Sequence, residues 1–357
     1  MVLAGFQQEL EKAGVSVEPL RGDAQGWDLL ARSGGYLPVD YSLGWVRYQS
    51  AYMAQSVAEY QACPVIIRHG DRSVGLWPVG IHRLESGAWT LGSNSEALLP
   101  PWFADGVGGR VQKDITKRCV AAVQAFLSSH ADQAVEIGTA APWQAVENET
   151  WVRAWLEAGS TTSNEFHLLV DLSLDLAQIH SHLRRRYRSY VNQGRRLWTV
   201  GIHEGQDSAP FLEAFRELHV QAAGRVTRGP ETWTRQAEAI LAREALLIDL
   251  RDASGALVGG GFFHYTRSEA FYGVGAYDRS LFDKPLGHLV QVAAIETFKT
   301  KGVRWYRVGT RRYPGESPPP SQKELQIAYF EEGFATHMLP RVAITWPPGT
   351  EAPRPAR

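Results

Sequence analysis

The chain has 357 residues, with 37 Lys or Arg against 38 Asp or Glu and a formal net charge of -1. This near-neutral charge excludes a protein that binds nucleic acid through its overall charge. Any contact with nucleic acid must come from a local positive patch, and we expect no DNA partner. The two cysteines, Cys63 and Cys119, are too few and too far apart for a disulfide framework or a metal site, and we expect no metal. No stretch approaches the roughly 18 apolar residues of a membrane helix, and no leader pattern opens the chain. A cytoplasmic protein without a membrane span, large enough for two domains, is the expectation.

The first half of the chain alternates between helical and strand patterns. Leu43, Val46 and Met53 recur at helical intervals after Ser42, which predicts a helix reaching Ala62. The following segments predict three strands in a meander, a second helix and a further strand: Pro64–His69, Ser73–Ile81, Ala88–Leu91, Lys113–His130 and Ala134–Ile137.

The second half repeats this order. The pattern predicts a helix, three strands, a helix and a strand over Glu231–Arg243, Ala245–Leu250, Leu257–Tyr265, Ala270–Ala276, Leu286–Lys301 and Arg304–Val308. An ordered match of several elements indicates two copies of one α/β module.

A basic segment joins the two halves. No acidic residue occurs between Leu176 and His203. On a single helix, Leu176, Ile179, Leu183, Tyr187 and Tyr190 would form one apolar stripe, flanked by Arg184, Arg188 and Arg195. Because guanidinium groups bind phosphate bidentately, this flank is a candidate phosphate-docking surface. A solvated amphipathic helix between domains is the alternative.

At three places the sequence resembles the FemABX-like branch of the GNAT acyltransferase superfamily. They are Leu183–Arg188 with Gly194-Arg195-Arg196, then Phe271–Ala276 with the helix that ends at Lys301-Gly302, and finally Lys323-Glu324-Leu325 with Phe330-Glu331-Glu332-Gly333-Phe334. The resemblance extends from about Trp45 to Phe334. It implies an α/β fold of two tandem GNAT-like modules, each a mixed, mostly antiparallel sheet flanked by helices. We expect modules over 1–165 and 201–346, a linking strand and basic helix over 166–200, and a disordered tail over 347–357.

The resemblance also implies transfer of an acyl or aminoacyl group to an amine, with aminoacyl-tRNA and a peptidoglycan precursor as the substrates in the best-known members. Acyl-CoA-binding GNAT modules carry a Gly-rich turn where this chain reads Phe282–His288, with one glycine. That difference disfavours a tight pyrophosphate cradle in the second module. No tightly bound cofactor is expected, and the donor is aminoacyl-tRNA or acyl-CoA.

Tyr272–Tyr277 is the candidate reacting centre. In GNAT modules the corresponding strand splays from its neighbour and offers amides to the donor carbonyl, and the glycines of this segment also permit a bulge. A glycine-weakened core strand is the alternative. The candidate catalytic residues are Tyr277, Asp278, His288, Lys323 and Glu324, and the candidate substrate-binding residues are Tyr272, Gly273, Gln291 and Arg311 with Arg184, Arg188 and Arg195.

These candidates differ in what suggests them. His288 is proposed as a base because an ordinary imidazole titrates near neutral pH, although a structural His at a helix start is the alternative. Arg311 could clamp an anion or be a solvated cation. Lys323 and Glu324 are candidates through the family tail, and by composition alone they would form an ordinary capped helix start.

The sequence thus predicts an N-acyltransferase that forms an amide in cell-envelope or secondary-metabolite biosynthesis, with charged tRNA as a possible partner and a small-molecule or nucleotide-linked amine as acceptor. An acyl-CoA-dependent N-acyltransferase acting on an amino sugar or small amine is the first alternative. A non-catalytic binding protein with this fold is the second.

Overall fold

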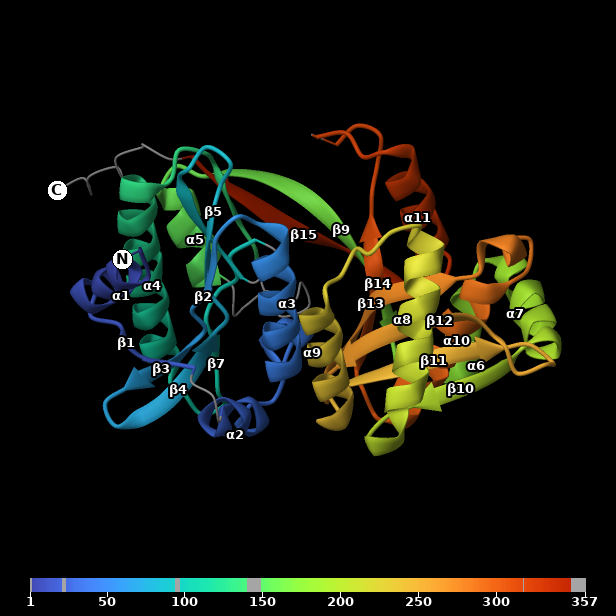
Figure 1. Cartoon of the computed structure of the whole chain (residues 1–357). Helices are drawn as coiled ribbons and strands as arrows, with labels where there is room; N and C mark the ends of the chain where they lie inside the picture. The colour runs from blue at the N-terminus through green and yellow to red at the C-terminus, as the bar shows by residue number, and fades with distance from the viewer. Residues whose placement is uncertain (1, 21–23, 94–96, 140–148, 317, 348–357) are drawn as a thin grey trace. The chain divides into compact units, whose positions relative to one another are not determined.

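The protein is described by a computed structural model over residues 2–20, 24–93, 97–139, 149–316 and 318–347. The chain divides into two compact units, one formed by Met1–Asn164 with Arg341–Arg357 and the other by Glu165–Pro340 (Figure 1). Each unit has hydrophobic clusters of its own.

The first unit combines short antiparallel sheets with helices. Its helices are α1 (Val2–Lys12), α2 (Gln25–Ser33), α3 (Leu43–Ser56), α4 (Gly109–His130) and α5 (Glu149–Glu157). Its strands are β1 (Ser16–Pro19), β2 (Tyr60–Ala62), β3 (Val65–His69), β4 (Arg72–Trp77), β5 (Gly80–Arg83), β6 (Trp89–Gly92), β7 (Trp102–Phe103) and β8 (Val135–Ile137). Seven of these strands form sheets in the orders β1-β3-β4-β7 and β2-β5-β6, and β8 belongs to neither. Trp77, Trp151 and Trp155 are fully buried and pack edge to face, with ring centroids 6.5 and 5.6 Å apart along the series.

Two expectations for this unit are wrong in detail. The helix that begins after Ser42 ends at Ser56 rather than at Ala62, and Tyr60–Ala62 forms the strand β2. The predicted strand Ser73–Ile81 is two strands, because Pro78 cannot donate a ladder hydrogen bond and the chain turns there, with Val79 N–H bonded to Trp77 O at 3.1 Å. The predicted meander is therefore divided between two sheets.

The second unit is one sheet with helices on both faces. Its strands are β9 (Thr161–Asp171), β10 (Thr199–His203), β11 (Ala245–Arg251), β12 (Leu257–Tyr265), β13 (Glu269–Tyr277) and β14 (Trp305–Arg311), in the order β10-β11-β12-β13-β14-β9. Its helices are α6 (Leu176–His182), α7 (Arg185–Leu197), α8 (Ala209–Ala223), α9 (Pro230–Leu241), α10 (Leu286–Thr300) and α11 (Gln322–Glu332). The pairs β10–β11, β11–β12, β12–β13 and β14–β9 are antiparallel, and β13–β14 is parallel.

Side-chain alternation along β11 separates the two faces of this sheet. Leu246 and Ile248 belong to the cluster that includes α10, whereas Ala245 and Leu247 belong to the cluster that includes α8 and α9. Figure 1 shows α8 across one face of the strands and α7 outside α10. The predicted elements of this half agree closely with the observed ones.

The basic segment is not one helix. It is broken at Leu183 and Arg184, whose backbones are extended, with ψ of 134° and 131°. The break allows the amide of Arg184 to donate to the carbonyl of Gly333 at 2.9 Å. Ile179, Leu183 and Tyr187 are nevertheless buried in the second unit's core. Residues 166–200, expected as a separate link, are therefore part of this unit.

The strand β15 (His337–Trp346) begins in the second unit and ends in the first, where Ile344–Trp346 pair antiparallel with β8. Residues 341–346, which were expected in the second module, thus belong to the first unit because their hydrogen bonds and the buried Trp346 lie there. Of the tail expected to be disordered, residues 348–357 lie outside the described residues.

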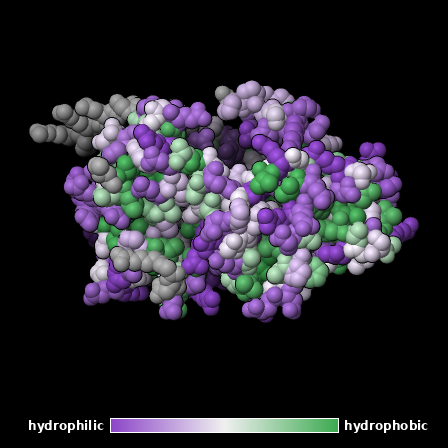
Figure 2. Space-filling view, in the orientation of Figure 1, coloured by the Kyte–Doolittle hydropathy of each residue, from purple (hydrophilic) through white to green (hydrophobic). Residues whose placement is uncertain are grey.

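Within the described part of the chain, no helix has the length and apolar character that crossing a membrane requires. On the face seen in Figure 2, hydrophobic residues lie in small groups between hydrophilic ones. Cys63 and Cys119 are buried free thiols, and burial raises the pKa of both.

Candidate functional site

The parallel strands β13 and β14 open away from each other. They pair only through Glu269 with Trp305, Ala270 with Tyr306 and Phe271 with Arg307. Beyond Phe271, β13 continues to Tyr277 along β12, while β14 continues to Arg311 along β9. Beyond Phe271, the edge of β13 that faces β14 therefore has no ladder pairing with that strand over Tyr272–Tyr277.

A bulge lies at the start of this opening. Phe262 of β12 pairs with Val274 and the next residue, Phe263, pairs with Tyr272, so Gly273 is the extra residue on β13. A bulge bends its strand and turns adjacent side chains. The register shift thus falls at the glycines that were expected to permit a bulge.

Glu331, near the end of α11, directs its carboxylate into the opening. The carboxylate lies against Gly309 of β14, where a Cβ atom would collide with it. Burial raises the pKa of Glu331 to about 8, and no hydrogen bond to the carboxylate opposes this effect in the described part of the chain.

Three buried tyrosines lie close enough to this carboxylate to interact with it electrostatically. The hydroxyls of Tyr272 and Tyr277 are 3.0 Å apart. Burial raises the pKa of Tyr277 to about 12 and also raises those of Tyr272 and Tyr306, with Glu331 a further cause for all three. The site therefore contains neutral phenols beside a carboxyl group that titrates close to physiological pH.

Gln291 of α10 reaches the same site from the face of the sheet that α10 covers. The Tyr306 hydroxyl donates to its Oε1, while its Nε2 has no hydrogen-bond partner although the residue is fully buried. An unpaired buried amide N–H is costly unless a ligand or water accepts from it. The structure thus brings the predicted Tyr272, Gly273, Tyr277 and Gln291 together with Glu331 and Tyr306.

His288 lies beside this cluster but is enclosed by aromatic rings. Its imidazole is 4.5 Å from the ring of Tyr187, 4.8 Å from that of Tyr190 and 5.1 Å from that of Phe330, centroid to centroid. Burial lowers the pKa of His288 to about 4. The near-neutral pKa assumed from the sequence is therefore wrong, since desolvation penalises the imidazolium.

Two predicted carboxylates are used in caps. Asp278 accepts hydrogen bonds from Ser280 N–H at 2.9 Å and from the Ser280 hydroxyl at 2.7 Å, which caps a short 3-10 turn. Glu324 accepts from Ser321 N–H at 2.7 Å in the capping box that starts α11. Lys323 and Glu324 are exposed, and about 12 Å of helix separates Lys323 from Glu331. The structure does not bring Asp278, Lys323 or Glu324 into the tyrosine cluster.

The three arginines expected to bind phosphate have partners within the protein. Arg184 is 3.5 Å from Glu332 and lies over the ring of Tyr329 at 3.8 Å. Arg188 donates to the carbonyl of Ser181 at 2.7 Å, and Arg195 pairs with Glu296 at 2.5 Å. The sequence could not show this, because the two acids come from α11 and α10.

The outward face of α7 carries the arginines that lack such partners. Arg185, Arg186 and Arg196 are exposed, and no described residue forms an ion pair with them. Arg185 and Arg196 lie opposite the buried stripe of Tyr187 and Val191 on the helix. The unpaired positive charge of α7 is therefore on these three arginines and not on the predicted Arg184, Arg188 and Arg195.

Arg311 is also held by an acid. Its Nε is 3.3 Å from Glu332 Oε2, and its NH1 donates to the Arg312 carbonyl at 2.6 Å. Glu332 thus bridges Arg311 and Arg184 and ties the end of α11 to β14 and α7. This arrangement positions the neighbouring Glu331.

Sequence reasoning missed Glu331 and Tyr306 as site residues. Glu331 has a usable signal, because it follows Leu325 and Ala328 at intervals of three and places a carboxylate on the packed stripe of α11. Tyr306 offers no comparable signal, since an inward Tyr in a strand is ordinary core.

No family model matches this sequence, and no curated protein matches it. Solved structures do match the fold. FemX has 11% sequence identity over 92% of this chain and 96% of its own, with a TM-score of 0.64. The chain has a FemX-like fold. L-PGS from Bacillus licheniformis is also similar, with 12% identity over 90% of each chain and a TM-score of 0.56.

The similarity to FemX confirms the predicted mixed α/β fold, and the chain divides into two units as expected. At these identities the similarity concerns the fold, so the chemistry has to be inferred from the site itself. The opening between β13 and β14, with Glu331 in it, is the candidate active site.

Proposed function

We propose that the protein is an N-acyltransferase that forms an amide by moving an acyl or aminoacyl group onto an amine at the opening between β13 and β14. The observation that carries the proposal is the Glu331 carboxylate, placed beside Gly309 in a strand opening lined by Tyr272, Tyr277 and Tyr306.

The proposed step requires a base, an oxyanion site and a proton donor. Glu331, with a pKa of about 8, takes a proton from the attacking amine. N–H groups on the edge of β13 that faces β14 stabilise charge on the carbonyl oxygen. The new C–N bond replaces the bond to the donor oxygen or sulfur. A neutral tyrosine hydroxyl gives its proton to that leaving group and regains one from the protonated Glu331 carboxyl, so that the carboxylate is restored.

For the donor we propose aminoacyl-tRNA, with its phosphates on the Arg185, Arg186 and Arg196 face of α7. These exposed guanidinium groups form no ion pair with any residue that the structure describes, and guanidinium groups bind phosphate bidentately.

Packing at the start of α10 also favours this donor over acyl-CoA. A Cβ on Gly287 would lie 3.1 Å from the ring of Phe330, and one on Gly194 would lie 3.2 Å from the carbonyl oxygen of Pro285. Both glycines thus admit close protein packing where a pyrophosphate-binding turn would need open backbone. We infer a small-molecule or nucleotide-linked amine as acceptor, in cell-envelope or secondary-metabolite biosynthesis.

The test is incubation with a panel of amines and either labelled aminoacyl-tRNA or labelled acyl-CoA, with transfer read by mass. Label from tRNA that disappears in Glu331→Gln supports both the chemistry and the donor. Transfer from CoA alone would retain the chemistry and overturn the donor. Transfer from neither donor, with every amine, would favour a non-catalytic binding protein.

A further inference from the structure

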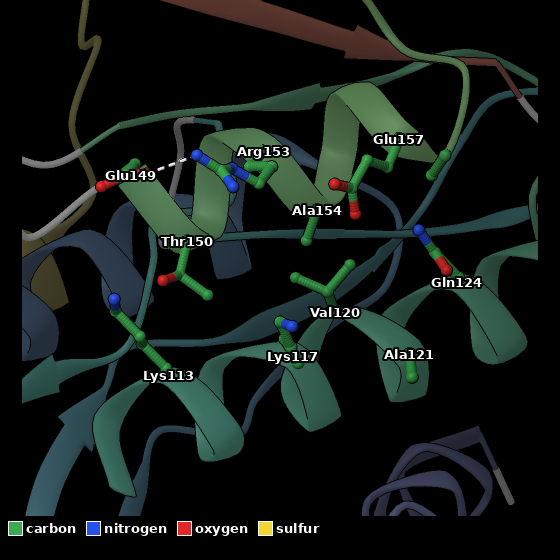
Figure 3. A pocket seen from close by; sticks show the side chains of 11 residues that line it. Lys113, Lys117, Val120, Ala121, Gln124, Glu149, Thr150, Arg153, Ala154 and Glu157 are labelled. Atoms are coloured by element: carbon green, nitrogen blue, oxygen red, sulfur yellow. Dashed lines mark hydrogen bonds and ion pairs between the residues drawn. The ribbon is translucent and has the colours of Figure 1, made fainter. Parts of the chain in front are cut away.

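A groove between two helices of the first unit contains charged groups that the proposed reaction does not use. It has a volume of about 400 Å³ and lies between α4 and α5 (Figure 3). Its floor is apolar, formed by Val120, Ala154 and Ala158, and polar side chains stand along its rims. This volume is within the range of small-ligand sites.

The polar groups are distributed unequally along the groove. In Figure 3, Lys113 lies toward the same end as Glu149 and Thr150, Lys117 lies near the middle, and Gln124 and Glu157 lie toward the other end. Glu149 is already paired with Arg153 at 2.5 Å. The groove therefore has a cationic end and an end with one carboxylate and one amide.

The groups at both ends are available to a ligand. Four side chains form no hydrogen bond or ion pair with any residue in the described ranges: Lys113, Lys117, Gln124 and Glu157. The ammonium groups of Lys113, at one end, and Lys117, near the middle, can together bind a carboxylate, while Glu157 and the Gln124 carbonyl can accept from an ammonium group.

We propose that this groove binds a linear zwitterion with its carboxylate at Lys113 and Lys117 and its ammonium at Glu157, namely a short peptide with free termini. The separation decides the length. Lys117 and Gln124 are seven residues apart on α4, about 10 Å along the axis. A single amino acid is too short, whereas an extended chain of about three residues, at roughly 3.4 Å each, spans the distance. Small side chains fit the floor of Val120 and the two alanines.

The proposal is tested by titrating the whole protein calorimetrically with trialanine that is unblocked, N-acetylated or C-amidated. We expect the unblocked peptide to bind best and each blocked form to bind about three- to five-fold more weakly, the range of exposed ion pairs. Glu157→Gln should weaken the unblocked peptide but leave the N-acetylated one unchanged. The double variant Lys113→Gln with Lys117→Gln should weaken the unblocked peptide but leave binding of the C-amidated peptide unchanged.

Arg72→Gln and Glu85→Gln are matched controls, since both residues are exposed on the first unit and neither lines the groove. Unchanged binding in both controls is expected. Equal affinity for all three peptides, or no binding of any of them at millimolar concentration, overturns the proposal. Because the readout is binding to the first unit, the result is independent of whether Glu331 is catalytic.

Discussion

Gly309 of β14 lies directly under the carboxylate of Glu331, so that any Cβ at this position would occupy the space of the Glu331 oxygens. Gly309→Ala should therefore push Glu331 out of the opening. We expect kcat/KM to fall by about tenfold or more, because the attacking amine then lacks its base. Gly315→Ala is the control, because nothing lies within 4 Å of a Cβ there. Full activity in a folded Gly309→Ala protein would remove Glu331 from the mechanism.

Much of the second unit could be predicted because its local patterns agree with its tertiary environment. The strands β11 to β13 are apolar runs bounded by turns, and the helix after them has its apolar residues at helical spacing. The charged site could not be predicted in the same way. Ion pairs of Arg184 and Arg195 with Glu332 and Glu296 depend on residues over 100 positions away, and no local pattern reports them.

Glu331→Gln should reduce kcat by about 100-fold or more, because the amide cannot accept the proton of the attacking amine. In the wild type, kcat/KM should rise with pH up to about 8 as the carboxyl group ionises, given its raised pKa. Rates over a pH series for both proteins provide the measurement. If Glu331→Gln keeps the same rise of kcat/KM with pH, a group other than Glu331 causes it.

The raised pKa of Glu331 also makes a prediction about stability. Between its ordinary value of 4.5 and about 8, the unfolded chain releases this proton and the folded chain keeps it. Stability is therefore lost as pH rises through this window and is not lost below it. At pH 8 and above, Glu331→Gln should be more stable than the wild type by about 1–3 kcal/mol in urea unfolding, with no gain at pH 4. A difference in unfolding free energy between the two proteins that stays constant at every pH would contradict the raised pKa of Glu331.

The arginines of α7 should separate into two classes. Arg184→Gln removes the contacts with Glu332 and Tyr329 and should cost about 1–2 kcal/mol of unfolding free energy. Joint replacement of Arg185, Arg186 and Arg196 by Gln should change stability by less than about 0.5 kcal/mol. That triple variant should instead raise the KM for the donor, by less at high salt. Equal effects on KM from a charge-matched set elsewhere, the exposed Arg32, Arg72 and Arg110 all changed to Gln, would refute the docking face.

His288 should behave as a packing residue. His288→Phe keeps a planar ring among Tyr187, Tyr190 and Phe330 and should retain most of the activity and the pH profile. Thermal unfolding monitors the fold in the same samples. A large fall in kcat with an unchanged melting temperature would instead identify His288 as a catalytic residue despite its lowered pKa.

The end of β15 sets an order of events during synthesis. Ile344 to Trp346 complete the first unit by pairing with β8, and the Trp346 ring packs against Trp155 at 5.9 Å. The ribosome therefore releases the last strand of the first-made unit only after the whole second unit has emerged. The first-made unit therefore cannot complete its fold before the second unit has been synthesised, unlike a chain whose domains finish folding one after the other from the amino end.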